Sequence, residues 1–164
     1  NADQVVSKIY SSDKDIYFQL KKKIPNLLFK FPIKKEDLIN AIIKNEKNIK
    51  IISSIVHPKV RKKLKIFLKK NKKKKFVILD IPLYLENKMD KKKDIIIFIK
   101  SNNKKKLKRI KNRKNFNQLI YRRFKNLQFS SILKMKKSNY VIKNDFNKNT
   151  ARKRVKDVLN KILS

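Results

Sequence analysis

The residues best suited to chemistry follow one apolar run in the middle of the chain. Residues 76–81 read FVILDI and are followed by Pro82, which has no N–H to donate to a β-ladder. A short apolar run of this kind is typical of a strand buried on both faces of a parallel sheet, and ligands bind beyond the carboxyl ends of such strands. Asp80, Pro82 and Glu86 fall at that edge. The sequence therefore predicts a site with carboxylates at the end of this strand.

Two arginines form a second candidate group. Arg109 and Arg113 are four residues apart, which places them on one face of a predicted helix over residues 101–113. Only seven of the 48 basic residues are arginine, so both depart from the chain's usual choice of lysine. A guanidinium group matches two phosphate oxygens at once, although a solvated helix face would also explain these residues.

The elements that would position these residues alternate between helices and short buried strands. Apolar runs at 94–99 and 139–142 predict two further strands. Apolar residues at helical spacing predict helices over residues 1–10, 13–28, 36–45, 48–56, 101–113, 116–137 and 147–163. Pro58 is expected to be the first residue of one more helix, after a break at His57. This alternation predicts an α/β fold.

Composition excludes several kinds of site and protein. The chain has no cysteine and one histidine, His57, so neither a disulfide framework nor a His/Cys zinc site can form. No apolar run approaches the ~20 residues that a membrane span requires, and residues 1–10 lack the pattern of a signal peptide. We expect a cytoplasmic protein without membrane contacts.

The net charge of +36 would ordinarily indicate a nucleic acid or another polyanion as partner. However, the lysines are spread along the whole chain and accompany many isoleucines and asparagines. We interpret most of them as solvated surface. A non-catalytic, basic nucleic-acid-binding protein remains the alternative, but it predicts arginine-rich or aromatic patches that the sequence does not show.

Glycine is absent from all 164 residues, whereas average usage is about 7%. A phosphate loop of the form G-x-x-x-x-G-K-[ST] therefore cannot occur in this sequence. The first residue is Asn1 rather than Met. Together these features lead us to expect that an N-terminal piece is missing.

Six short motifs in a fixed order carry a resemblance to a known family. They are NAD at 1–3, IVHP at 55–58, IPLYLE at 81–86, LKR at 107–109 followed by Arg113, Gln128, and SNYVIKN at 138–144. Each motif is weak alone, but together they resemble the dephospho-CoA kinase family along nearly the whole chain. The resemblance implies a P-loop kinase, a three-layer α/β fold with a parallel sheet, whose first strand and phosphate loop are missing here. It divides the chain into a nucleotide-binding core (1–10, 76–101 and 138–164), a helical insertion for dephospho-CoA (11–75) and a lid (102–137).

The activity that the resemblance implies is transfer of the γ-phosphate of ATP to the 3′-hydroxyl of dephospho-CoA with Mg²⁺, the last step of coenzyme A biosynthesis. Without a phosphate loop, these 164 residues alone are expected to be inactive. Another small P-loop kinase, for a nucleoside monophosphate or a shikimate-like acceptor, is an alternative that the Pro-Leu-x-x-Glu and His-Pro motifs disfavour.

The resemblance also implies roles for individual residues. Asp3 would accept the proton of the attacking hydroxyl, with a helix N-cap as the competing interpretation. Arg109 would act in catalysis and, with Arg113, bind the phosphates of ATP, while Lys143 and Asn144 would line its adenine.

The acceptor substrate would contact a second set of residues: His57, Pro82, Leu83 and Glu86. Packing remains an equal alternative for His57, and Glu86 is also suited to orienting a nearby arginine or lysine. Asp80 lies near the end of the apolar run, where a carboxylate would help to hold Mg²⁺, although the family does not require an acid at this position.

Overall fold

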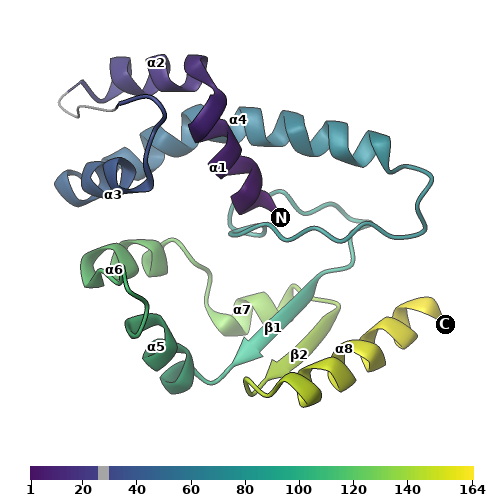
Figure 1. Ribbon diagram of the computed structural model, residues 1–164. Coiled ribbons are helices and arrows are strands. Elements are labelled where there is room, and N and C mark those ends of the chain that lie inside the picture. Colours follow the sequence, from purple (N-terminus) through teal and green to yellow (C-terminus); the bar gives the residue numbers. More distant parts are fainter. Residues whose placement is uncertain (26–29) are drawn as a thin grey trace. The chain divides into compact units, whose positions relative to one another are not determined.

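The computed structural model describes residues 1–25 and 30–164, and the chain forms two compact units, Asn1–Pro82 and Leu83–Ser164 (Figure 1). The first unit contains four helices among its described residues: α1 (Ala2–Ser12), α2 (Lys14–Lys23), α3 (Lys35–Lys44) and α4 (Lys47–Lys70). The second unit combines a parallel pair of strands with helices: β1 (Ile97–Ser101), α5 (Asn103–Lys111), α6 (Gln118–Asn126), α7 (Ser131–Lys136), β2 (Tyr140–Asn144) and α8 (Lys148–Leu163). This mixture of helices and a small parallel sheet is consistent with the predicted α/β class.

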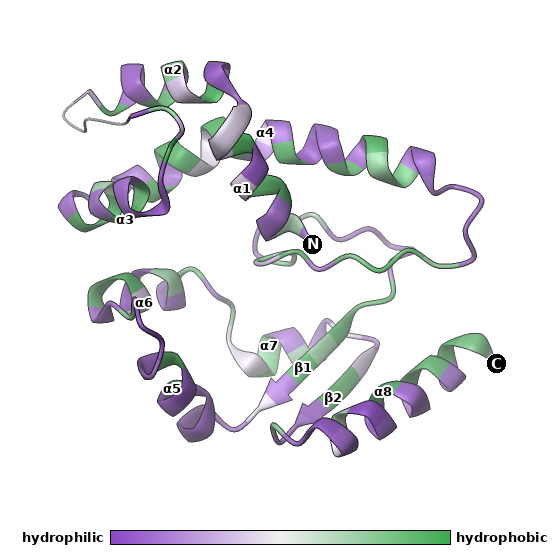
Figure 2. Ribbon diagram, in the orientation of Figure 1, coloured by the Kyte–Doolittle hydropathy of each residue, from purple (hydrophilic) through white to green (hydrophobic). Residues whose placement is uncertain are grey.

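The core of the first unit forms where α1, α2 and α3 pack on α4. Each of these helices carries hydrophobic and hydrophilic residues on its surface, as Figure 2 shows by colour. Ile9 of α1 and Leu20 of α2 are the largest side chains that are completely buried in the described part of the chain. Asn48, at the start of α4, is the one buried polar side chain among the described residues, and it donates a hydrogen bond of 2.8 Å to the carbonyl of Ala41. That bond removes the cost of burying an amide group.

Helix α4 runs through Pro58 without interruption, so the prediction that Pro58 begins a new helix was wrong. The apolar residues on both sides of the proline follow one stripe at spacings of three or four: Ile49, Ile52, Val56, Val60 and Leu64. Ile49, Ile52 and Val56 are buried. We attribute the continuous helix to the packing of this stripe, which offsets the roughly 3 kcal/mol that a proline costs inside a helix.

Residues 76–81 pair with no other strand in the described part of the chain, so the prediction of a buried strand there was wrong. Their backbone is joined to α1 by a hydrogen bond of 2.9 Å from the N–H of Ala2 to the carbonyl of Asp80. Phe76 is 48% exposed and Ile78 is 85% exposed. An apolar run shows that a segment is suited to a sheet, but a strand also needs a neighbour that accepts and donates its hydrogen bonds.

The sheet of the second unit consists of β1 and β2, which are parallel and pair Ile97 with Tyr140 at one end and Ser101 with Asn144 at the other. The segment that contains α5, α6 and α7 connects the two strands, as parallel pairing requires. Helix α8 packs on β2, and α7 packs on β1. The strands predicted at 94–99 and 139–142 are thus confirmed, although they lie further along the chain than expected. With only two strands, each strand has an outer edge without a β-partner among the described residues.

Three predicted helices are shorter than expected. The prediction of a helix over 13–28 corresponds to α2, which ends at Lys23, and residues 26–29 lie outside the described residues. The helix predicted over 101–113 ends at Lys111, and the one predicted over 116–137 is divided into α6 and α7. Among the described residues, no helix is both long and apolar enough to cross a membrane.

Candidate functional site

The start of α1 separates two roles that the sequence left open for Asp3. Asn1 is the N-cap, because its Oδ1 accepts a hydrogen bond of 2.8 Å from the backbone N–H of Asp3. The alternative interpretation of Asp3 as the cap was therefore wrong. Asp3 lies in the first helical turn, it is exposed, and its carboxylate has no hydrogen bond or ion pair with any other described residue. The carboxylate is thus available to a ligand.

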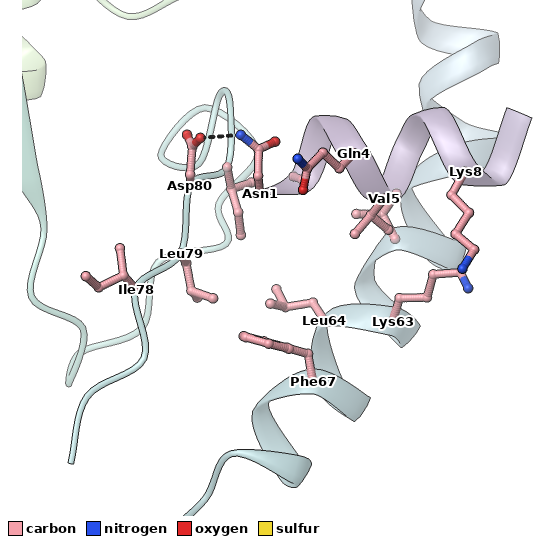
Figure 3. A pocket seen from close by; sticks show the side chains of 13 residues that line it. Asn1, Gln4, Val5, Lys8, Lys63, Leu64, Phe67, Ile78, Leu79 and Asp80 are labelled. Atoms are coloured by element: carbon pink, nitrogen blue, oxygen red, sulfur yellow. Dashed lines mark hydrogen bonds between the residues drawn. The ribbon is translucent and has the colours of Figure 1, made fainter. Parts of the chain in front are cut away.

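A pocket opens beside this turn, between α1, the second half of α4 and residues 78–81 (Figure 3). Its volume is about 330 Å³. Ala2 and Gln4, the neighbours of Asp3 in sequence, are among its lining residues. The apolar part of the lining consists of Val5, Val60, Leu64, Phe67, Ile78, Leu79 and Ile81.

Charged groups lie at two sides of the pocket. Figure 3 shows Lys8 and Lys63 near each other on one side and Asn1 with Asp80 on the other. The amide of Asn1 donates a hydrogen bond of 2.6 Å to Oδ2 of Asp80. Two neighbouring ammonium groups repel each other, so this side of the pocket is suited to an anion.

His57 lies on α4, three residues before Val60 of the pocket lining. It is half-buried, and this burial, helped by the positive charge of Arg61, lowers the pKa of the imidazole. Because the ordinary pKa of histidine is already near 6.5, His57 is neutral at pH 7. A neutral imidazole can both donate and accept a hydrogen bond.

In the second unit, three of the predicted ATP-binding residues come together at the carboxyl end of the sheet. Lys143 and Asn144 are the last two residues of β2, and Asn144 pairs with Ser101, the last residue of β1. Helix α5 begins two residues after that strand and carries Arg109. The Arg109 guanidinium lies over the ring of Phe146, with its Cζ 4.9 Å from the ring centroid. This edge is where ligands bind in parallel sheets.

Arg113 does not share a helix face with Arg109, so that part of the prediction was wrong. Helix α5 ends at Lys111, and the N–H of Arg113 bonds to the carbonyl of Ile110, only three residues back. The segment 111–115 contains no apolar side chain that could hold another helical turn against the sheet. Arg113 therefore projects from a turn rather than from the helix.

The residues predicted to bind the acceptor near 82–86 form a tight turn instead of a strand end. Leu83 has a positive φ of 55°, and its carbonyl accepts a hydrogen bond of 2.9 Å from the N–H of Asn87. Tyr84 donates a hydrogen bond of 2.5 Å to Asp94, and burial together with this carboxylate raises the pKa of the phenol. Pro82 is the exposed last residue of the first unit.

Glu86 connects this turn to α7. Its Oε1 accepts hydrogen bonds from the backbone N–H of Phe129, at 2.9 Å, and from Nζ of Lys134, at 2.7 Å. Partial burial works to raise the pKa of Glu86, but these two donors outweigh it and hold the pKa below its usual value. Glu86 thus orients a lysine, one of the two roles predicted for it.

The described residues contain no group of three metal-binding side chains that could hold an ion by themselves. Asp80 is an exposed carboxylate with one oxygen bonded to Asn1. Mg²⁺ in nucleotide enzymes is held by one or two carboxylates together with substrate phosphates and water. A single carboxylate such as Asp80 fits a nucleotide-bound Mg²⁺, but not a site made of protein alone.

Sequence reasoning did not identify Phe146 or Arg154, the latter of which bonds to the turn after β2. No sequence signal distinguishes Phe146, because its role depends on a turn conformation. Arg154 could have been found, since it is one of the seven arginines and the same argument was applied to Arg109.

Comparisons with known proteins agree with the motifs. A model of the family described as dephospho-CoA kinase matches residues 1–150. The dephospho-CoA kinase of Wolbachia pipientis wMel is 29% identical over 164 residues, which cover 99% of this chain and 84% of that protein. The dephospho-CoA kinase of Rickettsia felis is 30% identical over 141 residues, which cover 86% of this chain and 72% of that protein. Because the family match extends over far more than half of the sequence, this chain belongs to the dephospho-CoA kinase family of enzymes.

Proposed function

We propose that this chain takes part in transfer of the γ-phosphate of ATP to the 3′-hydroxyl of dephospho-CoA, the last step of coenzyme A biosynthesis. Membership in a kinase family favours this function over non-catalytic nucleic-acid binding. The observation that carries the proposal is at α1: Asn1 caps the helix, so the Asp3 carboxylate is exposed and without a partner among the described residues.

In the proposed reaction, Asp3 accepts the proton of the 3′-hydroxyl while the hydroxyl oxygen forms a bond to the γ-phosphorus. The bond from that phosphorus to the bridging oxygen breaks, and ADP leaves with the electron pair. Arg109 neutralises negative charge on the moving phosphoryl group, since positioning and charge neutralisation provide most of the catalysis in phosphoryl transfer. Mg²⁺, when bound with the nucleotide, would supply further neutralisation, and Asp80 is the proposed protein ligand.

The adenine of ATP is proposed to lie beside Lys143 and Asn144. The Oδ1 of Asn144 already accepts a hydrogen bond of 2.8 Å from the N–H of Phe146. The amide nitrogen of Asn144 is therefore the side-chain group that remains to donate to a base. Arg113, in the turn after α5, is proposed to reach the phosphates of ATP.

The acceptor is proposed to bind on the first unit, beside Asp3. Dephospho-CoA combines phosphates with a long, less polar arm, and the pocket combines an apolar lining with Lys8 and Lys63. His57 is neutral at pH 7 and is suited to a hydrogen bond with an uncharged part of the substrate. Pro82, Leu83 and Glu86 remain proposed acceptor contacts, with Glu86 acting through Lys134.

The absence of glycine has a direct consequence for activity. Backbone amides of a glycine-rich loop normally bind the β- and γ-phosphates of ATP, and no such loop can form from these 164 residues. We expect the 164-residue chain alone to turn over dephospho-CoA far more slowly than the same chain extended at its N-terminus by a strand and a phosphate loop. Equal rates from the two proteins would contradict this expectation.

The main test of the proposal is Asp3→Asn in the extended protein. Asparagine keeps the size of the side chain but cannot accept the proton, so kcat should fall by ~10²–10⁴-fold, the usual contribution of a general base. Affinity for dephospho-CoA should change little, and the thermal midpoint should stay nearly the same because Asn1 provides the cap.

A matched control is Asp15→Asn, which changes an exposed acid at the start of α2. It should leave kcat unchanged. Full activity in Asp3→Asn, or an equal loss in both variants, would remove Asp3 from the role of base.

A further inference from the structure

Three contacts hold the turn that follows β2. The guanidinium of Arg154, on α8, donates a hydrogen bond to the carbonyl of Lys143 and lies 3.3 Å from Oδ2 of Asp145. The other oxygen of Asp145 accepts a hydrogen bond of 3.0 Å from the N–H of Asn147. Arg154 therefore joins the end of β2 and the turn after it to α8.

Phe146 lies within this turn in an unusual backbone conformation. Its φ is 69°, in the left-handed region that side chains with a Cβ normally avoid. The Asn144 side chain bonds to its N–H, at 2.8 Å, and so fixes the direction in which the residue leaves the strand. The ring is half-buried, and its face lies under the guanidinium of Arg109 at 4.9 Å.

We propose that Arg154 is a positioning residue for Arg109. By holding the turn that contains residues 143–146, it fixes the ring of Phe146, and the ring in turn holds the guanidinium of Arg109 at the carboxyl end of the sheet. The role of Arg109 in phosphate binding rests on the proposed function, but the positioning itself does not.

The arrangement is physically reasonable because Arg109 is exposed and no ion pair holds its guanidinium among the described residues. An exposed arginine samples many rotamers in water, whereas a cation within about 6 Å of an aromatic face is attracted to it. Ser101 and Asn144 are paired, so the start of α5 and the turn before α8 lie at the same end of the sheet. The contact between Arg109 of α5 and Phe146 of the turn thus fixes the guanidinium at this end of the sheet and leaves it exposed to a ligand.

The positioning can be tested by NMR on the 164-residue chain, without any need for activity. The Nε–Hε signal of Arg109, assigned from its loss in Arg109→Lys, should show an upfield ring-current shift. Arg154→Gln should remove much of that shift, as should Phe146→Leu, which keeps the bulk of the side chain but not the ring. Phe146→Tyr should retain it.

The control is Arg152→Gln, which removes the same charge from an exposed position on the same helix. It should leave the Arg109 signal unchanged. An Arg109 signal unaffected by Arg154→Gln, or affected equally by Arg152→Gln, would overturn the proposal. Dispersed backbone spectra of each variant would show that a lost shift does not come from unfolding.

A kinetic measurement on the extended, active protein separates this inference from the proposed function. If both are correct, Arg154→Gln lowers kcat by up to ~10²-fold, the cost of misplacing a group by about 1 Å, and leaves KM for dephospho-CoA unchanged. If Arg154→Gln removes the shift while Arg109→Lys has normal kcat, the positioning stands and the role of Arg109 in phosphate binding is wrong.

Discussion

Glu86 provides the sharpest test of how the second unit is held together. The carboxylate accepts two hydrogen bonds on one oxygen, and the side chains of Glu86 and Lys134 are only 9% and 19% exposed. Hydrogen bonds to charged groups contribute roughly 1.5–3 kcal/mol and those to neutral groups roughly 0.5–1.5 kcal/mol. Glu86→Gln keeps the shape but removes the charge, so each bond should lose about 1 kcal/mol, and the total loss should be about 1–2 kcal/mol after partial screening at Lys134.

The stability lost in Glu86→Gln should be larger at neutral pH than at acidic pH. Burial opposes ionisation of Glu86, but the hydrogen bonds from Lys134 and Phe129 lower its pKa below the ordinary value of 4.5. A carboxylate with a lowered pKa in the folded state contributes stability above its ordinary pKa and loses it as the pH falls through the folded pKa. The difference between the native protein and Glu86→Gln should therefore be complete at pH 7 and shrink below about pH 4.5.

Thermal unfolding and hydrogen exchange together measure this effect. A loss of about 1–2 kcal/mol lowers the midpoint of a unit of this size by roughly 4–16 °C. Exchange of the Phe129 amide should also become faster, because that N–H donates to Glu86. The control is Asp157→Asn, which changes an exposed charge on α8 of the same unit. It should change neither the thermal midpoint nor the exchange rate of the Phe129 amide. An unchanged midpoint and unchanged Phe129 exchange in Glu86→Gln would refute the reasoning.

Three further predictions concern α4, its contact with the start of α2, and Arg109 of α5. Pro58→Ala should raise the free energy of unfolding of the first unit by roughly 1–3 kcal/mol, and with it the thermal midpoint, because an exposed proline is replaced by the best helix former. A lower midpoint would show that the proline is needed. Asp13→Asn keeps the cap of α2 but loses the 2.8 Å ion pair with Lys59. The thermal midpoint should therefore fall slightly at low salt and match the native value at high salt. A loss that does not depend on salt would contradict this. Arg109→Lys should lower kcat in the extended protein because the guanidinium fork is lost, whereas Lys106→Arg should not; normal kcat in Arg109→Lys would place Arg109 on a solvated face.

The sequence predicted those parts of the fold that depend on local pattern. The apolar stripes of α1 to α4 contain Ile9, Leu20, Ile42 and Ile52, all of which are buried, because a helix needs only its own residues and one apolar face. The two paired strands were also predicted, and the ordered motifs indicated the correct family. Boundaries were less accurate because helix ends depend on caps and neighbours as well as on periodicity.

Other features depend on interactions that no local pattern contains. The strand expected at residues 76–81 needs a hydrogen-bonding neighbour, and Ile78 remains exposed without one. The continuation of α4 through Pro58 is a balance between packing and helix propensity. In the candidate site, Asp3 and Arg109 were predicted from the resemblance to the family, and their roles stay predictions. The contact of Arg109 with Phe146 could not be predicted, because it requires a left-handed turn in a residue other than glycine.

The two-stranded sheet has a consequence for the behaviour of this protein in solution. Ile97, Ile99 and Val141 are 39%, 50% and 41% exposed, beside strand edges that have no β-partner among the described residues. Such edges and apolar faces favour association between copies, while the net charge of +36 keeps copies apart. Salt shortens the range of charge repulsion, from about 10 Å at 0.1 M to about 3 Å at 1 M, but does not weaken apolar attraction. Light scattering should therefore increase with ionic strength, and the protein should be concentrated in low-salt buffer, where its lysines act as a colloidal stabiliser.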